Sequence, residues 1–99
     1  MTDPHHDASD EGWPCHLAPG VEALLLDPAT DPALFSAVLA ATVAINEHRG
    51  EVPGHTTSER WPQQRRLPLG DGGLLGVAEY VVVADADPPH CVLTRVQPF

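Results

Sequence analysis

The side chains with the most scope for chemistry are arginines, and they gather in one part of the chain. Four of the five basic residues, Arg49, Arg60, Arg65 and Arg66, lie within one short segment. Trp61 stands among them, and an indole ring beside guanidinium groups can stack on a base while the cations contact phosphate. This grouping predicts an anion-binding or nucleic-acid-binding patch that contains Arg60, Trp61, Arg65 and Arg66.

The same residues also have a purely structural interpretation. Trp61 would then cover the edge of the core, and the arginines would be solvated or paired with Glu51 and Glu59. The net charge of −9 at pH 7 favours this alternative, because non-specific nucleic-acid binding needs a cationic face that releases counterions from phosphates. An acidic chain can still carry a local basic site, so both interpretations stay open.

Potential metal ligands occur near the N-terminus. They are His5, His6, Asp7, Cys15 and His16. A zinc site needs ligands held in place at compact spacings, whereas Pro4, Gly12 and Pro14 form a flexible frame around these residues. We therefore expect a solvated tail, with no bound metal and no other cofactor.

Groups for acid/base or nucleophilic catalysis are sparse. Glu79 and His90 fall on neighbouring predicted strands near a turn, where they could form an acid/base pair or an ordinary surface pair. Ser36 and Ser58 lie in no sequence motif that marks a hydrolase nucleophile. The sequence therefore assigns no catalytic residue.

Length and composition set the class of protein. The 99 residues suffice for one domain, which we expect over residues 13–99 after a disordered acidic tail at residues 1–12. The chain has neither an apolar run long enough to cross a bilayer nor the start of a secretory signal. A soluble cytoplasmic protein without membrane contact is expected, and Cys15 and Cys91 then suit buried thiols better than a disulfide.

Two helices are predicted in the first half. Residues 19–26 form a short helix that starts at a proline. The longer helix spans residues 31–49, with Asp31 as its N-cap and Gly50 just past its end. Leu34, Val38, Leu39 and Ile45 are expected to be buried. The apolar surface of this helix is wider than one buried face needs, so either both flanks are covered or one flank meets a partner chain, for example in a homodimer.

The second half is predicted to form strands. Residues 74–84 and 91–96 are rich in β-branched side chains and are separated by Asp and Pro, which indicates a hairpin. Residues 65–69 add a third strand through the glycine-rich turn at residues 70–73. The fold class is therefore α+β, with a small antiparallel sheet packed against two helices. A further strand is expected at residues 13–17, and residues 51–64 form a long connection.

This order of strand, two helices, loop and three-strand meander resembles the RelE/ParE superfamily of bacterial toxins over residues 13–97. The segments HLAPGVEALLL and RRLPLGDGGLLGVAEYVVVADADPPHCVLTRV carry the likeness. Members that cut messenger RNA place basic residues on the strands. By position, Arg65 and Arg66 match the basic start of the first meander strand, and Arg95 matches the arginine often found on the last. This chain departs from the pattern at the middle strand, where Glu79 is the only charge, and in its tail VQPF.

The resemblance implies a toxin-like protein, either a component of a toxin–antitoxin pair with an antitoxin-like partner or a degenerate relative that kept the fold. Arg65, Arg66 and Arg95 would then contact phosphate. The alternative is a non-enzymatic acidic interaction module that binds a protein partner through its apolar helix and the edge of its sheet. A short neighbouring reading frame for an antitoxin-like protein would favour the first hypothesis.

Overall fold

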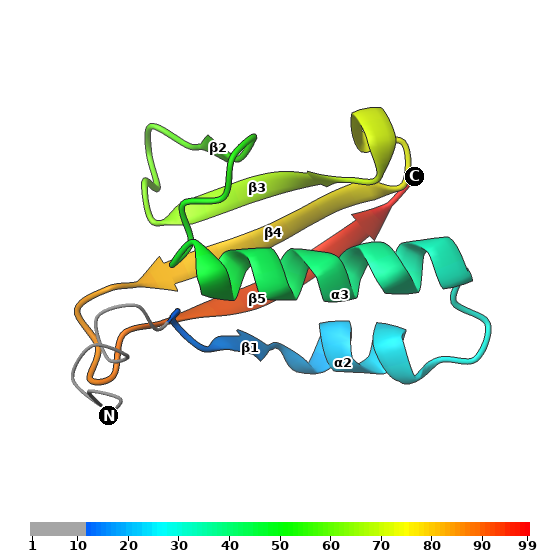
Figure 1. Cartoon of the computed structure of the whole chain (residues 1–99), viewed down its shortest axis with the longest axis horizontal. Coiled ribbons are helices and arrows are strands. Elements are labelled where there is room, and N and C mark those ends of the chain that lie inside the picture. The colour runs from blue at the N-terminus through cyan, green and yellow to red at the C-terminus, as the bar shows by residue number, and fades with distance from the viewer. Residues whose placement is uncertain (1–11) are drawn as a thin grey trace, which may run out of the picture.

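The computed structural model describes residues 12–99, so most of the expected acidic tail lies outside the described residues. Two helices and one five-stranded sheet form an α+β fold (Figure 1). Among the described residues, no helix has the length and apolar character to cross a membrane. The elements, in chain order, are β1 (Cys15–Leu17), α2 (Pro19–Leu26), α3 (Pro32–Glu47), β2 (Thr56–Thr57), β3 (Gln64–Leu69), the 3-10 turn η1 (Asp71–Gly73), β4 (Gly76–Val83) and β5 (His90–Pro98).

The strands lie in the order β1-β5-β4-β3-β2. Neighbours from β2 to β5 are antiparallel, which confirms the predicted meander. β1 instead pairs parallel to β5, with Cys15 beside Cys91 and Leu17 beside Leu93. The sheet is therefore mixed rather than antiparallel throughout. Parallel neighbours need a long crossover connection, and here that connection comprises both helices and the remaining strands.

Local signals fix both ends of α3 close to where the sequence places them. The Asp31 side chain accepts a hydrogen bond from the Ala33 amide, at 3.1 Å, and Pro32 occupies the first helical position. At the other end the Gly50 amide donates to the Ile45 carbonyl at 2.9 Å, with φ of 85° at Gly50. A Cβ on Gly50 would lie 2.5 Å from Val82 Cγ2, so glycine is needed there for both conformation and space.

The core lies between α3 and one face of the sheet. Leu34, Val38, Ala41 and Ile45 form the buried side of α3, and they share a cluster with Val21 of α2 and with the inward side chains of β3, β4 and β5. Tyr80, at the centre of β4, is fully buried, and its hydroxyl donates to the Gly50 carbonyl at 2.7 Å. This bond ties the end of α3 to the middle of the sheet.

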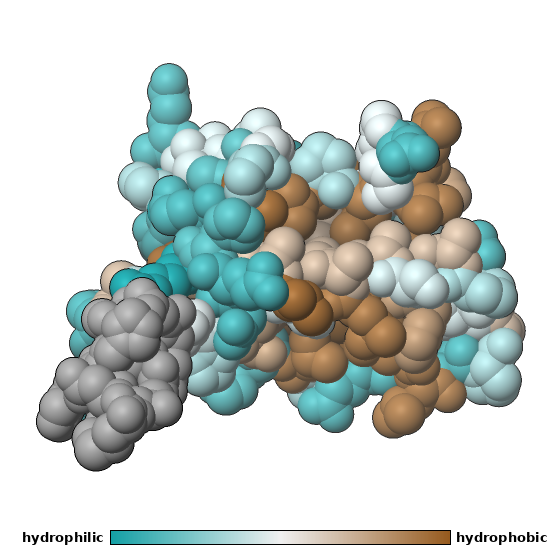
Figure 2. Space-filling model, in the orientation of Figure 1, coloured by the Kyte–Doolittle hydropathy of each residue, from teal (hydrophilic) through white to brown (hydrophobic). Residues whose placement is uncertain are grey.

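The expected burial of Leu39 is wrong. Leu39 is 42 % exposed, and Phe35 and Val43 on the same side of α3 are 37 % and 55 % exposed. These three side chains lie on the side of α3 away from the core, and α2 does not cover them. Figure 2 shows hydrophobic side chains gathered on the face formed by the helices. The first arrangement considered for the wide apolar helix, with both flanks covered within the chain, is therefore wrong, and whether the exposed flank meets a partner chain stays a prediction.

The long connection at residues 51–64 contains one element that the sequence did not predict. β2 has two residues, Thr56 and Thr57, which pair with Arg66 and Arg65 and extend the sheet by one edge strand. A strand this short contains no period-two alternation from which it could be recognised. The pairing of β2 with β3 anchors the arginine-rich segment along the sheet edge.

Candidate functional site

The side of the sheet turned away from the helices carries the candidate site. Successive residues of a strand point to opposite faces, and Leu67 and Leu69 of β3 point into the core. Arg66 therefore points away from it. In the sheet register Arg66 lies opposite Glu79, and Glu79 lies opposite Arg95. These three residues form a row across β3, β4 and β5, which we call the Arg–Glu–Arg row.

The middle of this row is an ion pair. Arg66 Nε lies 3.1 Å from Glu79 Oε2, and the Glu79 side chain is only 12 % exposed, whereas Arg66 is 65 % exposed. A register shift at Glu79 and Tyr80 inserts Thr94 as an extra residue in β5, and the Thr94 hydroxyl donates to the Glu79 carbonyl at 3.1 Å. Bulges of this kind redirect neighbouring side chains, and here Arg95 lies opposite Glu79 on the uncovered face.

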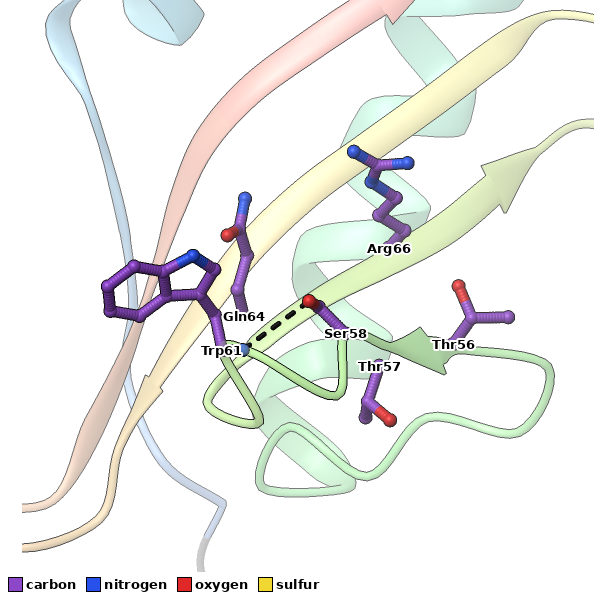
Figure 3. A pocket seen from close by; sticks show the side chains of 6 residues that line it. All are labelled: Thr56, Thr57, Ser58, Trp61, Gln64 and Arg66. Atoms are coloured by element: carbon purple, nitrogen blue, oxygen red, sulfur yellow. Dashed lines mark hydrogen bonds between the residues drawn. The ribbon is translucent and has the colours of Figure 1, made fainter.

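A shallow pocket of about 270 Å³ adjoins the row at the β2–β3 edge. Figure 3 shows Arg66, Gln64 and Trp61 on the side of the sheet turned away from α3. The Trp61 ring is about half exposed, and the Arg60 guanidinium carbon lies 6.0 Å from the centre of that ring. The pocket thus offers one aromatic surface together with hydroxyl, amide and guanidinium groups. Its lining residues are Thr56, Thr57, Ser58, Trp61, Gln64 and Arg66.

Arg65 lies on the opposite side of the sheet from its neighbour Arg66. Its guanidinium pairs with the Glu51 carboxylate, donates through Nε to the Pro62 carbonyl at 2.8 Å, and approaches His55 Nε2 at 3.1 Å. His55 Nδ1 lies 2.6 Å from the Val52 carbonyl, so its proton sits on Nδ1 and Nε2 accepts from Arg65. These contacts hold the connection of residues 51–65 in place and give Arg65 a structural role.

The structure therefore divides the arginine-rich patch expected from the sequence. Trp61 and Arg66 line the pocket, and Arg60 lies next to Trp61. Arg95 joins them through the row, and Arg65 does not. The pairing of Arg65 with Glu51 follows the structural alternative, whereas the exposure of Trp61 does not. Sequence reasoning missed the pocket residues Ser58 and Gln64 and the place of Glu79 between two arginines. Cross-strand register, which the sequence alone does not specify, would have revealed the row.

The two histidines of the same face lie elsewhere. His16 and His90 meet edge to face, with ring centres 5.2 Å apart, and His90 lies opposite Val83. Glu79 is four residues from Val83 along β4, so the structure does not bring Glu79 and His90 together as an acid/base pair. Within residues 12–99 no three His, Cys, Asp or Glu side chains form a group that could hold a metal; His5, His6 and Asp7 lie outside this range.

The cysteines are adjacent but unsuited to nucleophilic chemistry. Cys15 and Cys91 lie opposite each other in β1 and β5 and are both free thiols. Burial, with a smaller contribution from the neighbouring Cys91, raises the pKa of Cys15 to about 11. Burial also raises the pKa of Cys91. Because the thiolate is the reactive form, both side chains are poor nucleophiles at neutral pH.

Basic and acidic side chains are distributed unevenly along the described chain. Residues 12–48 contain Glu22, Asp27, Asp31 and Glu47 and neither Lys nor Arg. Residues 49–99 hold all five arginines together with six acidic residues. Of these arginines, Arg66 and Arg95 belong to the row, and Arg60 lies beside Trp61.

Comparison of the chain with protein-family models, curated proteins and solved structures finds no match.

Proposed function

We propose that this chain is a toxin-like protein of the RelE/ParE fold that binds single-stranded RNA across the uncovered face of its sheet. The proposal is supported by the element order, which is the order on which the resemblance to that superfamily rests. The observation that carries it is the Arg–Glu–Arg row beside the exposed Trp61. Guanidinium groups next to an exposed aromatic ring suit a phosphate backbone with unstacked bases.

The geometry of the row leaves donors available for a phosphate. Arg66 uses Nε for Glu79, and within the described residues its two terminal nitrogens have no partner. A guanidinium presents these nitrogens in a fork that matches phosphate oxygens. Arg95 supplies a second cation on the other side of Glu79. A phosphate held between the two arginines would lie beside Trp61 and the hydroxyl groups of the pocket, which can receive the adjoining nucleotide.

The same row offers a test of whether binding leads to cleavage. Glu79 could take the proton of a ribose 2′-hydroxyl while the oxygen of that hydroxyl attacks the adjacent phosphorus. The arginines would stabilise the charge that develops on the phosphate, and the departing 5′-oxygen would take its proton from water. A Glu79→Gln variant that keeps RNA affinity but loses RNA cleavage would make this an enzyme. Binding without any RNA cleavage by the parent would make it a degenerate, binding-only relative, and equal cleavage by both proteins would exclude Glu79 as the base.

The proposal is tested by expression in a bacterial host and by RNA binding in vitro. Expression should arrest growth, and an Arg66→Ala, Arg95→Ala double variant should relieve the arrest. The double variant should also bind a labelled single-stranded oligoribonucleotide at least about tenfold more weakly. The slope of log affinity against log salt should fall by roughly one per lost phosphate contact.

Leu39→Gln with Val43→Gln provides the control for this experiment. Both side chains are exposed on α3, in the layer opposite the Arg–Glu–Arg row. Measured at a temperature at which all variants are folded, this double variant should leave RNA affinity within about twofold of the parent, since the two surfaces are separate and share no contact. Unimpaired growth at high expression would exclude the toxin function. An equal loss of RNA affinity in Leu39→Gln with Val43→Gln would exclude the proposed site.

A second candidate function is supported by a different surface. Phe35, Leu39 and Val43 form an exposed apolar side of α3, which suits a non-enzymatic module that binds a protein partner. This function and RNA binding use opposite layers of the molecule. They can therefore be separated by substitutions in one layer at a time.

A further inference from the structure

The outward side of α3 is apolar and uncharged along almost its whole length. Phe35, Leu39 and Val43 follow one another at intervals of four residues, and no charged residue occurs between Pro32 and Asn46. We call these three side chains the α3 ridge. A helix that is apolar on all sides is normally buried on all sides. Contiguous exposed apolar surface of this kind marks interaction sites on soluble proteins.

The shape of this surface fits another helix. Side chains spaced four residues apart form a ridge, and helices pack by fitting such ridges into grooves on their partner. Ser36 and Ala40 are exposed beside the α3 ridge, and small side chains there leave a groove that can receive larger ones. The continuous stripe, rather than an isolated pocket, indicates a partner that lies along α3 over several turns.

The charges around the ridge select the kind of helix. Asp27 and Asp31 lie at the N-terminal end of α3, and Glu47 is its last residue. None of the three forms an ion pair with another described residue. A second copy of this chain would place Asp31 against either Asp31 or Glu47 of the first, depending on its direction. Like charges brought together across an interface repel each other, which argues against the homodimer.

We propose that the α3 ridge is a docking surface for an amphipathic helix of another protein, with Lys or Arg on both flanks of an apolar stripe. The proposal rests on the second candidate function and is independent of RNA binding. The partner's apolar side chains would bury Phe35, Leu39 and Val43. Its basic residues would meet the acidic groups at both ends of α3 and speed association through electrostatic steering.

Two synthetic helical peptides test the proposal directly. Both carry the same leucine stripe; one has lysine at the flanking positions and the other has glutamate. Fluorescence anisotropy of labelled peptide against the full chain should give at least about tenfold tighter binding for the lysine peptide, with affinity falling as salt increases. Equal affinities, or no binding of either peptide at millimolar protein, would overturn the proposal.

Variants locate the binding and exclude a general attraction to an acidic protein. Leu39→Gln with Val43→Gln should weaken binding of the lysine peptide at least about tenfold. Leu74→Gln is the matched control, because Leu74 is a highly exposed leucine outside the helices. Asp31→Asn with Glu47→Gln should weaken binding of the lysine peptide and should not weaken binding of the glutamate peptide. An unchanged affinity in Leu39→Gln with Val43→Gln would refute docking at the ridge.

Two further measurements separate this proposal from its rivals. Arg66→Ala with Arg95→Ala should bind the lysine peptide as the parent does, so failure of RNA binding and failure of docking are distinguishable. Sedimentation of the chain alone at micromolar concentration should show a monomer. A stable dimer that Leu39→Gln dissociates would make a second copy the occupant of the ridge and would overturn the proposal.

Discussion

Replacing Tyr80 with phenylalanine removes one oxygen from the centre of the molecule and tests how the end of α3 is held. Tyr80 is fully buried, and its hydroxyl donates to the Gly50 carbonyl at 2.7 Å. Phenylalanine keeps the ring and its packing but leaves that buried carbonyl without this donor. An unsatisfied buried acceptor costs about 1–2 kcal/mol. We therefore expect Tyr80→Phe to lower the free energy of unfolding by that amount at neutral pH.

The pH dependence of the free energy of unfolding gives a second, independent test of the same side chain. Burial raises the pKa of Tyr80 from 10.0 to about 12, partly offset by the positive charge of Arg65. Between these values the folded chain holds a proton that the unfolded chain has lost, so stability falls as pH rises. The stabilisation is complete below pH 10 and is lost through about pH 12. Two pKa units correspond to about 3 kcal/mol.

Phenylalanine has no proton to lose, so the variant lacks this contribution while the cysteine contributions remain common to both proteins. The parent is expected to be more stable at pH 8, and the two stability curves should cross near about pH 11. Urea unfolding followed by far-ultraviolet circular dichroism at a series of pH values measures both effects. A stability difference that stays constant from pH 8 to pH 12 would refute the argument. So would equal stability of the two proteins at pH 8.

Two other predictions test particular contacts. Gly50→Ala should lower the free energy of unfolding by at least about 2 kcal/mol, because Gly50 has a φ of 85° and a Cβ there would lie 2.5 Å from Val82 Cγ2. Gly54 has a φ of 89° but lies in open space. Gly54→Ala should therefore cost only about 1 kcal/mol, and urea unfolding measures both values. In Ellman's assay at pH 8 the folded chain should react slowly at Cys15, because only about a thousandth of that thiol is thiolate. Cys91 should react only as fast as the chain unfolds. Rapid reaction of either thiol before unfolding would contradict the burial that raises both pKa values.

Much of the fold could be predicted because its signals are local. Asp31 and Pro32 start α3 and Gly50 follows its end, and each acts through contacts within a few residues. The β-branched run before the Asp- and Pro-containing turn likewise specified the β4–β5 hairpin. The parallel pairing of β1 with β5 was not predictable in the same way. It depends on where the last strand lies once all the others are in place.

The candidate site was only partly predictable, for the same reason. The composition of the arginine-rich segment drew attention to Arg60, Trp61, Arg65 and Arg66, but the two adjacent arginines of β3 serve opposite faces. Because successive side chains of a strand point to opposite faces, the apolar Leu67 already indicated that Arg65, two residues earlier, points toward the helices. Nothing local indicated that Glu79 would lie between Arg66 and Arg95, because that depends on the register of three strands. The exposure of Leu39 depended on how far α2 extends over α3.

The parallel pairing of β1 with β5 has a consequence for the order of events in folding. The strand nearest the start of the described chain takes its place beside the strand nearest the end, with Cys15 next to Cys91. Loop-closure entropy makes such distant pairings slow to form. On the ribosome, β1 must wait until β5 has emerged, so until then the helices and β1 remain without their complete sheet. Of the five strands of this sheet, β5 is made last and provides the partner of β1, so a chain interrupted after β4 should remain unfolded.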